Sequence, residues 1–590
     1  MKILYRLLLM FVIALTSSAM TTHAESHQAS QPVRLSWDAD HRGVSLSNGF
    51  LQVHITPTGN INSVRYADIE TVLPSKKGNS YLSYNTDSVR FGSIQADTVI
   101  VARQSDELVE LIYVNSHTTK GWIWQLGYVM RKGVCGYYTY AAVQSVAKAS
   151  GHYNGQLDEA RIVHRLNPKV FNYAWVSDDN QGPQPSTEAL KKPLQKIQDA
   201  TFLLSDSTIY TKYDYCNYVK DDALHGMMGD QVGVWLITPS FEWVNGGTNK
   251  QELTVHGDDK SPLILQMFQS WHFGAGPTLF SEGGRKLYGP ALVYYNQGSR
   301  QSMIADAKRQ TTQELKAYPY PWMQHDLFPV SRGTVKGRVT LDKAFGTSRF
   351  QVVLAQTDGS WMQHGEGYQF WAETDDKGNF TIPHVRPGSY TVYAYALNGE
   401  ATGMFEKPAV SVKPGKNDIG TLTWNLKKPG RTLWRIGESD HRSAGFRLSD
   451  HRRQYGLFDE VPADLTYTIG KSQPEKEWYY AQTKNGSWDI VFQNASDYSK
   501  PLRLTIATAG SSSRARARVL LNDKRVGEVK TDNDSGIYRC AMQSGQPGLY
   551  TFDIQPELLR KGENKLTLQV INIKRVGGIM YDCIKLETNE

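Results

Sequence analysis

The stretch RPGSYTVYAYAL, residues 386–397, decides the fold class of this chain. A turn at Pro387-Gly388 precedes a run in which Tyr390, Val392 and Ala394 face one way and the residues between them face the other. Such a period of two is typical of a β-strand with one face in a core.

Strand-like runs recur along the chain, and helical patterns are scarce. Runs such as VELIYV (109–114) and VGVWLI (232–237) are bounded by Gly, Asn, Asp and Pro. One stretch, STEALKKPLQKIQ (186–198), predicts a helix because Ser186 can cap its start and Glu188 stands in its first turn. The chain is therefore expected to be an all-β protein built from sandwiches.

The first 24 residues have the pattern of a secretory signal peptide. Lys2 and Arg6 form a basic region, residues 7–15 form an apolar core too short to cross a membrane, and Thr22-His23-Ala24 provides a cleavage site. We predict that residues 1–24 are removed and that the mature chain is exported, to the periplasm or out of the cell. No later apolar run is long enough to span a membrane.

The remaining sequence is long enough for about three domains. We place the first at 25–325, ending near YPYPWMQHDLFP (318–329), whose three prolines predict an extended linker. Residues 326–429 predict a small immunoglobulin-like or fibronectin-like sandwich. Residues 430–590 predict a jelly roll of the kind that binds sugars. This third section contains no acid–base pair, so we expect it to supply polymer affinity rather than chemistry.

One strand of the third section is basic on one face. Arg514, Arg516 and Arg518 alternate with small apolar residues. This face is either simply solvated or a contact for an anionic polymer.

Composition points towards an acidic carbohydrate partner. The formal net charge is +7, and the basic residues are spread along the chain, which argues against nucleic acid. The 14 Trp and 32 Tyr favour sugar binding in an exported chain because aromatic rings stack on sugar faces, although most of them must fill cores. We expect a monomer that binds an anionic carbohydrate and neither nucleic acid nor membrane.

Four cysteines in an exported chain allow three disulfide pairings. We predict a Cys540–Cys583 pair because both lie in the third section, while Cys135 and Cys216 either pair or stay free. None has the spacing of metal ligands. The Asp-rich turns at 375–376 and 532–534 are of a kind that can hold a structural calcium ion, but are more often plain turns.

The first section carries the candidate chemistry. Lys212 stands in YTKYDY (210–215) between Tyr210 and Tyr213, and is either a surface cation or a base that loses its charge in a crowded, apolar setting. His225, in HGMMGD, is either a satisfied turn residue or a substrate contact, and we keep it among the substrate-binding candidates with Tyr210 and Tyr213. His272 lies between two aromatic residues in SWHFG (270–274).

Taken together, the quoted stretches resemble the rhamnogalacturonan lyases of polysaccharide lyase family 4. The resemblance extends through all three sections and includes DEARIVHRLNP (158–168), YTKYDY, SWHFG, KLYGPALVYYN (286–296), YQFWAETDDKGNF (368–380), LWRIGESDHRSAGFRLSD (433–450) and GIMYDCIKLE (578–587). Matches spread over three domains are more specific than any single motif.

The resemblance implies a fold and a reaction. The fold is an N-terminal β-supersandwich of the galactose-mutarotase type, a fibronectin type III-like domain and a C-terminal jelly roll similar to carbohydrate-binding modules. The reaction is β-elimination at the bond from rhamnose to O4 of galacturonate in rhamnogalacturonan I, with Lys212 and His272 as the catalytic residues. Arg161 is the closer match to the family's substrate-binding arginine, and Arg165 is the alternative. This chemistry requires no cofactor.

The residue types suit such a reaction. Removal of the C5 proton of galacturonate needs a base, departure of O4 needs an acid, and the growing charge on the carboxylate needs a cation. Two other functions remain open from the sequence: a non-catalytic carbohydrate-binding protein and a mutarotase-like sugar epimerase.

Overall fold

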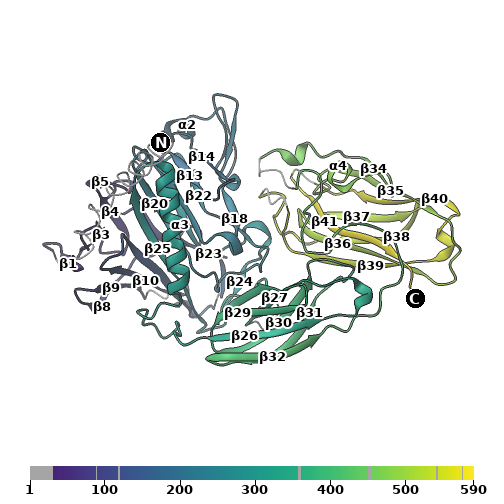
Figure 1. Cartoon of the computed structure of the whole chain (residues 1–590). Helices are drawn as coiled ribbons and strands as arrows, with labels where there is room; N and C mark the ends of the chain where they lie inside the picture. Colours follow the sequence, from purple (N-terminus) through teal and green to yellow (C-terminus); the bar gives the residue numbers. More distant parts are fainter. Residues whose placement is uncertain are drawn as a thin grey trace, which may run out of the picture.

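The computed structural model describes residues 31–589, apart from residues 41, 77, 88, 117–119, 154, 357–359, 450–454, 540–542 and 574–575. The predicted signal peptide lies outside the described residues. Figure 1 shows three β-rich bodies, with the middle one below the other two in that view. The prediction of an all-β protein is confirmed. In the described part of the chain, no helix is long and apolar enough to cross a membrane.

Two large sheets make up the first body. One follows the order β1-β2-β3-β4-β6-β12-β23-β22, with β5, β7 and β24 attached at its sides. Its strands are β1 (Arg34–Trp37), β2 (Val44–Ser47), β3 (Leu51–Ile55), β4 (Ile61–Tyr66), β5 (Ile69–Glu70), β6 (Ser80–Thr86), β7 (Gly92–Ser93), β12 (Gln156–Arg165), β22 (Val255–Gly257), β23 (Pro262–Gln269) and β24 (Thr278–Leu279).

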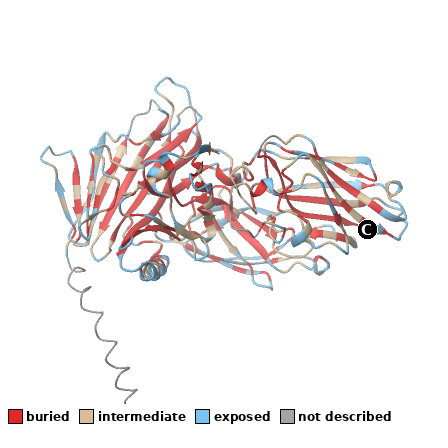
Figure 2. Ribbon diagram, turned by 90° about the horizontal axis from the view of Figure 1, so that it is seen from above, coloured by how far each residue is buried: buried red, intermediate tan, exposed pale blue. Residues whose placement is uncertain are grey.

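The second large sheet follows the order β14-β13-β19-β20-β25-β11-β10-β9-β8. Its strands are β8 (Thr98–Gln104), β9 (Leu108–Asn115), β10 (Trp122–Arg131), β11 (Gly136–Ser145), β13 (Tyr173–Trp175), β14 (Gln181–Pro183), β19 (Leu224–Met228), β20 (Val232–Ile237) and β25 (Arg285–Gln297). Strand β25 is central and buried along almost its whole length, as its apolar run KLYGPALVYY requires. Figure 2 shows buried residues along the strands of each body and exposed residues mainly at loops and edges.

Several small elements beside the large sheets contain the residues of the candidate site. They are β15 (Gln195–Gln198), β16 (Thr201–Leu203), β17 (Ile209–Thr211), β18 (Cys216–Tyr218), β21 (Gln251–Leu253) and the short 3-10 helices η2 (Lys212–Asp214), η3 (Val219–Asp221) and η4 (His272–Gly274). Strands β15, β16 and β17 form one small sheet, and β18 and β21 form another.

The middle and third bodies are sandwiches. The middle one packs β26 (Gly333–Thr340), β29 (Asn379–Val385) and β32 (Gly415–Thr423) against β27 (Phe350–Ala355), β28 (Gln369–Glu373), β30 (Gly388–Ala396) and β31 (Phe405–Val412). The third packs β33 (Thr432–Gly437), β36 (Leu502–Ser512), β39 (Gly548–Ile554) and β41 (Gly578–Glu587) against β34 (Leu465–Thr468), β35 (Gly486–Asn494), β37 (Arg516–Leu521), β38 (Lys524–Lys530) and β40 (Gly562–Val570). Short helices η5 (Lys343–Phe345), α4 (Pro474–Glu477), η6 (Leu457–Asp459) and η7 (Pro556–Leu558) lie in their loops.

The helix prediction was wrong in two places. The helix predicted over 186–198 is only α2 (Thr187–Lys191), capped by Ser186, because Pro193 disfavours helical geometry at Lys192 and the chain then enters β15. Among the described residues the longest helix is α3 (Arg300–Ala317), which was missed. It buries Met303, Ala307, Thr311 and Glu314, and because only Met303 among them is large and apolar, the helix shows almost no apolar periodicity.

Two further expectations need correction. The predicted linker at 318–329 contains no strand, but it is not a free tether, because Tyr318 and Tyr320 are buried and Tyr320 packs on Tyr138 at 5.3 Å. The thiol of Cys583 is free and buried, which opposes the predicted Cys540–Cys583 disulfide, and Cys540 lies outside the described residues.

Buried polar contacts join the three bodies. Glu242 of the first accepts hydrogen bonds from Arg332 and Arg386 of the middle body, at 2.7 and 2.6 Å. The third body contacts the first beside β18 and β21, where Tyr218 donates to Gln543 at 3.0 Å and Ser544 donates to the carbonyl of Asn249 at 2.8 Å. These contacts place a loop of the third body next to the first.

Candidate active site

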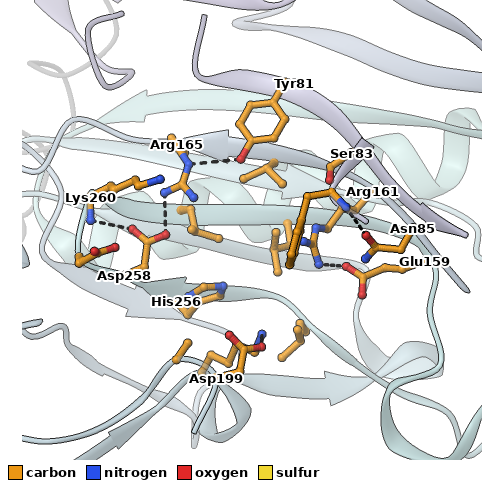
Figure 3. A pocket seen from close by; sticks show the side chains of 18 of the residues that line it. Tyr81, Ser83, Asn85, Glu159, Arg161, Arg165, Asp199, His256, Asp258 and Lys260 are labelled. Atoms are coloured by element: carbon orange, nitrogen blue, oxygen red, sulfur yellow. Dashed lines mark hydrogen bonds and ion pairs between the residues drawn. The ribbon is translucent and has the colours of Figure 1, made fainter. Parts of the chain in front are cut away.

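A cleft of about 930 Å³ opens over one face of the first sheet. Part of it is drawn in Figure 3. Its charged lining consists of Arg90, Arg161, Arg165, Lys191, Lys196, Lys212, Lys260 and Arg539 against Glu159, Asp199, Asp258 and Asp259. Eight cationic side chains against four carboxylates favour an anionic ligand.

Strand β12 forms the floor of this cleft. Glu159, Arg161, Val163 and Arg165 alternate along it, so their side chains point to the same face of the sheet. A strand rises ~3.3 Å per residue, so these four positions extend along roughly 20 Å of the cleft. That length suits several consecutive sugars of a polymer rather than one monosaccharide.

Lys212 begins η2 and lies inside the cleft, only 7% exposed. Its backbone N–H donates to the carbonyl of Ala200, and its Nζ donates to a carboxylate oxygen of Asp199 at 2.6 Å. The Tyr213 ring lies 5.2 Å from Nζ. Lys212 is therefore a buried group held in place at both ends, not a surface cation.

The surroundings of Lys212 lower its pKa to about 8. Burial is the main cause, and the charges of Arg161 and Arg539 act in the same direction. Asp199 opposes them through its charge and hydrogen bond. Burial raises the pKa of Asp199 itself, but the charge and hydrogen bond of Lys212, together with the charges of Arg539 and His256, outweigh burial and lower this pKa to about 2. A neutral lysine is thus accessible near physiological pH.

His272 begins η4 and is also buried in the cleft lining. Its Nδ1 lies 3.5 Å from Oε1 of Glu252, and its Nε2 lies 3.8 Å from Oε2 of Glu159. Burial lowers the pKa of His272, and Glu252 partly offsets this. The Tyr213 ring is 6.3 Å from the His272 ring, so one tyrosine separates Lys212 from His272.

A buried network holds Glu252 in place. Ser270 donates to Oε2 of Glu252 at 2.5 Å, and Nζ of Lys250 lies 3.5 Å from the same oxygen. Lys250 also donates to the carbonyls of Ser270 and His272, at 2.9 and 2.7 Å. The pKa of Glu252 falls to about 2, because Lys250, His272 and Ser270 outweigh its burial. Glu252 is therefore a fixed anion beside the imidazole.

The two candidate arginines have different surroundings. Arg161 forms a close ion pair with Glu159, and burial lowers its pKa while its charge acts on Lys212. Arg165 lies farther along β12, where its guanidinium donates to Asp258 at 2.7 Å and to the hydroxyl of Tyr81 at 3.4 Å. Both arginines are thus paired with a carboxylate, and Arg161 is the one whose charge acts on the candidate base.

Arg539 enters the cleft from the third body. Its guanidinium carbon lies 5.1 Å from the centre of the Tyr213 ring, and its charge acts on both Lys212 and Asp199. The third body, which we expected to supply polymer affinity, therefore also contributes a cation to the cleft that contains Lys212.

Three predicted substrate contacts are placed away from the cleft lining. Tyr213 is fully buried and packs between Lys212 and His272. The hydroxyl of Tyr210 donates to Gln184 at 2.8 Å and accepts from the N–H of Gly257 at 2.5 Å. His225 is buried, with its ring nitrogens 3.1 Å from Asp222 and 3.2 Å from the carbonyl of Leu265. Tyr213 supports the site by packing, and His225 belongs to the core because both of its nitrogens are satisfied there.

Sequence reasoning missed four charged residues of the site. Glu159 stands two residues before Arg161, so strand alternation could have paired them. Glu252 stands in the stretch NKQEL (249–253), but nothing local ties it to His272. Asp199 fell just after the overextended helix, and Arg539 lies in another body, so no local signal connects either residue to Lys212.

Within the described residues, no group of three or more His, Cys, Asp or Glu side chains is placed to hold a metal ion. The turn at 375–376 is stabilised by its own backbone, since Asp375 accepts from the N–H groups of Lys377 and Asn379 at 2.9 and 2.8 Å.

The fold and the cleft together define a class of protein. It consists of several β-sandwich domains, and its cationic groove contains acidic and basic side chains and suits an anionic polymer. Residues 16–203 match the Rhamnogalacturonate lyase family, residues 331–418 match polysaccharide lyase family 4, domain II, and residues 432–586 match domain III of that family. The chain belongs to polysaccharide lyase family 4, the rhamnogalacturonate lyase family.

Two relatives named as rhamnogalacturonate lyases agree with this assignment. The rhamnogalacturonate lyase of Dickeya dadantii is 33% identical over 565 residues, which cover 93% of each chain. The probable rhamnogalacturonate lyase B of Aspergillus niger is 28% identical over 58% of this chain and 54% of its own length. A galactose mutarotase-like protein from Lactobacillus casei aligns with 43% of this chain and all of its own at 13% identity, with a TM-score of only 0.27.

Proposed function

We propose that this protein is a lyase that cleaves the rhamnogalacturonan I backbone of pectin by β-elimination. The bond broken joins rhamnose to O4 of galacturonate, and the product carries a C4=C5 double bond in the new terminal uronate. The observation that supports this most is the presence of Lys212, His272 and Arg161 in one cationic cleft. Family membership supports the same reaction.

The uronate carboxylate is bound first. Arg161 and Arg539 are the cations beside Lys212, and a guanidinium can pair with both carboxylate oxygens. As the C5 proton leaves, negative charge grows on this carboxylate and is stabilised in place by the same cations. Arg165 is the alternative partner, and it lies farther along β12 in an ion pair with Asp258.

Lys212 then removes the C5 proton. The electron pair of the C5–H bond forms the C4=C5 double bond, and the bond from C4 to the glycosidic oxygen breaks. His272 donates its Nε2 or Nδ1 proton to that oxygen, which leaves as the anomeric hydroxyl of rhamnose. Glu252 stabilises the protonated imidazole before the transfer. Lys212 ends protonated and His272 neutral, so proton exchange with solvent restores both.

The proposal extends to the substrate, the partners and the location of the protein. The ligand is an anionic plant cell-wall polysaccharide, the protein acts as a monomer exported through its signal peptide, and no cofactor takes part because Lys212 and His272 supply both proton transfers.

The test uses the full chain and purified rhamnogalacturonan I. The proposal predicts new ultraviolet absorbance from the conjugated unsaturated uronate, together with a fall in polymer length. A shorter polymer without that absorbance would indicate hydrolysis, and binding without cleavage would support the carbohydrate-binding alternative. Interconversion of free-sugar anomers without depolymerisation would support the epimerase alternative.

A further inference from the structure

Phe91 presents an exposed ring at the edge of the cleft. It is 77% exposed, yet it belongs to the cleft lining. A ring this exposed gains little from burial and leaves apolar surface in water. Its function is therefore better sought in a ligand than in the fold.

The backbone at Phe91 is held in an unfavourable conformation. Its φ is +52°, in the left-handed region that bulky side chains rarely adopt. The N–H of Phe91 donates to Oδ1 of the buried Asn85 at 2.6 Å, and the next residue, Gly92, begins β7 and pairs with Tyr84. Strain maintained by surrounding structure is characteristic of functional sites. Here it fixes where the exposed ring points.

Phe91 lies at the His272 end of the cleft. Asn85, which holds Phe91, is the cross-strand partner of Glu159. Glu159 in turn lies 3.8 Å from Nε2 of His272. Arg165 marks the opposite direction along β12. Because His272 protonates the glycosidic oxygen in the proposed reaction, the sugar released from that oxygen extends towards Phe91.

We propose that Phe91 forms the subsite for the 6-deoxyhexose on the leaving side of the scissile bond. This inference rests on the proposed function and deepens it. A rhamnose ring has a methyl group at C6 and carries no charge, so it suits an aromatic platform better than a uronate does. Trp271, which precedes His272 and is 37% exposed, lines the same cleft and adds a second apolar wall.

The neighbour of Phe91 fits the alternating polymer. Arg90 lines the cleft beside Phe91 with its side chain 59% exposed, 3.7 Å from Asp158. The sugar beyond the leaving rhamnose is a galacturonate, for which an accessible arginine is a suitable partner. The adjacent aromatic ring of Phe91 and cation of Arg90 thus match the adjacent deoxy sugar and uronate of the polymer.

The test compares two ligands in a catalytically inactive Lys212→Ala background of the full chain. One ligand is a rhamnogalacturonan oligosaccharide that spans the scissile bond, and the other is the elimination product, which has no sugar on the Phe91 side. Adding Phe91→Ala should weaken binding of the spanning ligand about five- to tenfold in calorimetry, as expected for one aromatic–sugar contact. Binding of the product should be unchanged. Phe91→Tyr should retain most of the affinity.

A matched control separates this effect from folding. Phe91→Gly removes the ring and the unfavourable φ together, so it should weaken the spanning ligand as Phe91→Ala does without lowering Tm. Trp37→Ala, which removes an exposed ring away from the cleft lining, should change neither ligand. Equal affinities with and without the Phe91 ring, or equal losses for both ligands, would overturn the inference. Failure of the Lys212→Ala parent to bind rhamnogalacturonan at all would instead contradict the proposed function.

Discussion

Nζ of Lys212 lies 2.6 Å from a carboxylate oxygen of Asp199, so the candidate base is buried and ion-paired at once. Burial lowers the pKa of Lys212 to about 8, and Asp199 prevents a larger fall. About a tenth of Lys212 is then neutral at pH 7. The carboxylate holds the amine in position, but it also stabilises the protonated amine and so reduces the fraction of neutral Lys212. Asp199 therefore affects the rate in two opposing ways.

The first prediction concerns the pH profile of kcat/KM, which reports the free enzyme. The active form needs neutral Lys212 and protonated His272, yet the pKa of Lys212 is about 8 and that of His272 is lowered from its ordinary value. Between these pKa values, the gain in neutral Lys212 cancels the loss of protonated His272. The profile should therefore be bell-shaped, with its alkaline limb near pH 8 set by Lys212.

Removal of the Asp199 charge should move the alkaline limb. Asp199→Asn deletes the group that raises the pKa of Lys212, so the limb should shift to lower pH. Asp259→Asn removes another carboxylate of the cleft lining and serves as the matched control. An unchanged limb in Asp199→Asn would show that Lys212 does not set it.

Glu252 should set the acidic limb in the same way. Glu252→Gln removes the carboxylate that raises the pKa of His272, so the acidic limb should move to lower pH and the plateau should fall. Glu252→Asp keeps the charge and should restore much of the plateau. Because Lys250 loses its buried partner in the Gln variant, thermal unfolding must first show a folded protein. A folded Gln variant with the wild-type acidic limb would contradict this role.

Arg539 should affect turnover although it lies in the third body. Its charge lowers the pKa of Lys212, so Arg539→Ala should move the alkaline limb to higher pH, opposite to Asp199→Asn, and reduce kcat/KM on short oligosaccharides. Arg516→Ala, on the exposed face of β37, is the control and should leave short substrates unaffected. A chain that ends near residue 430 should be nearly inactive even when folded. Full activity of that shortened chain would contradict the role of Arg539.

The two arginines of β12 should respond differently to lysine. Arg161→Lys loses the bidentate carboxylate contact and should reduce kcat/KM by about 10- to 100-fold. Arg165→Lys should cost less, because Arg161 is the arginine of β12 whose charge acts on Lys212. Steady-state kinetics on one oligosaccharide decide between them. The reverse ranking would assign the carboxylate clamp to Arg165.

The fold class and the two central residues were accessible from sequence for different reasons. Period-two runs indicate strands directly. The run from Tyr390 to Ala394, for example, lies wholly within β30. Lys212 and His272 came from family resemblance, and the structure places both in one cleft. Helix α3 was missed because its buried positions are not strongly apolar.

The charged partners of the site could not be predicted from sequence. Asp199, Glu252 and Arg539 act on Lys212 or His272 only because β-sheet pairing and body-to-body packing bring distant segments together. Such contacts have no local sequence pattern. The buried position of His225 has the same kind of cause, since its neighbour Leu265 belongs to β23, a distant segment.

The central claim is that Lys212 is the base and His272 the acid of an elimination. Lys212→Ala and His272→Ala should each lower kcat by about 10²- to 10⁴-fold, with a much smaller effect on binding. The most direct measurement repeats both variants on a substrate whose leaving group departs without protonation. The account predicts that this substrate partly rescues His272→Ala and leaves Lys212→Ala inactive. Equal rescue of both variants, or rescue of Lys212→Ala alone, would contradict the assignment.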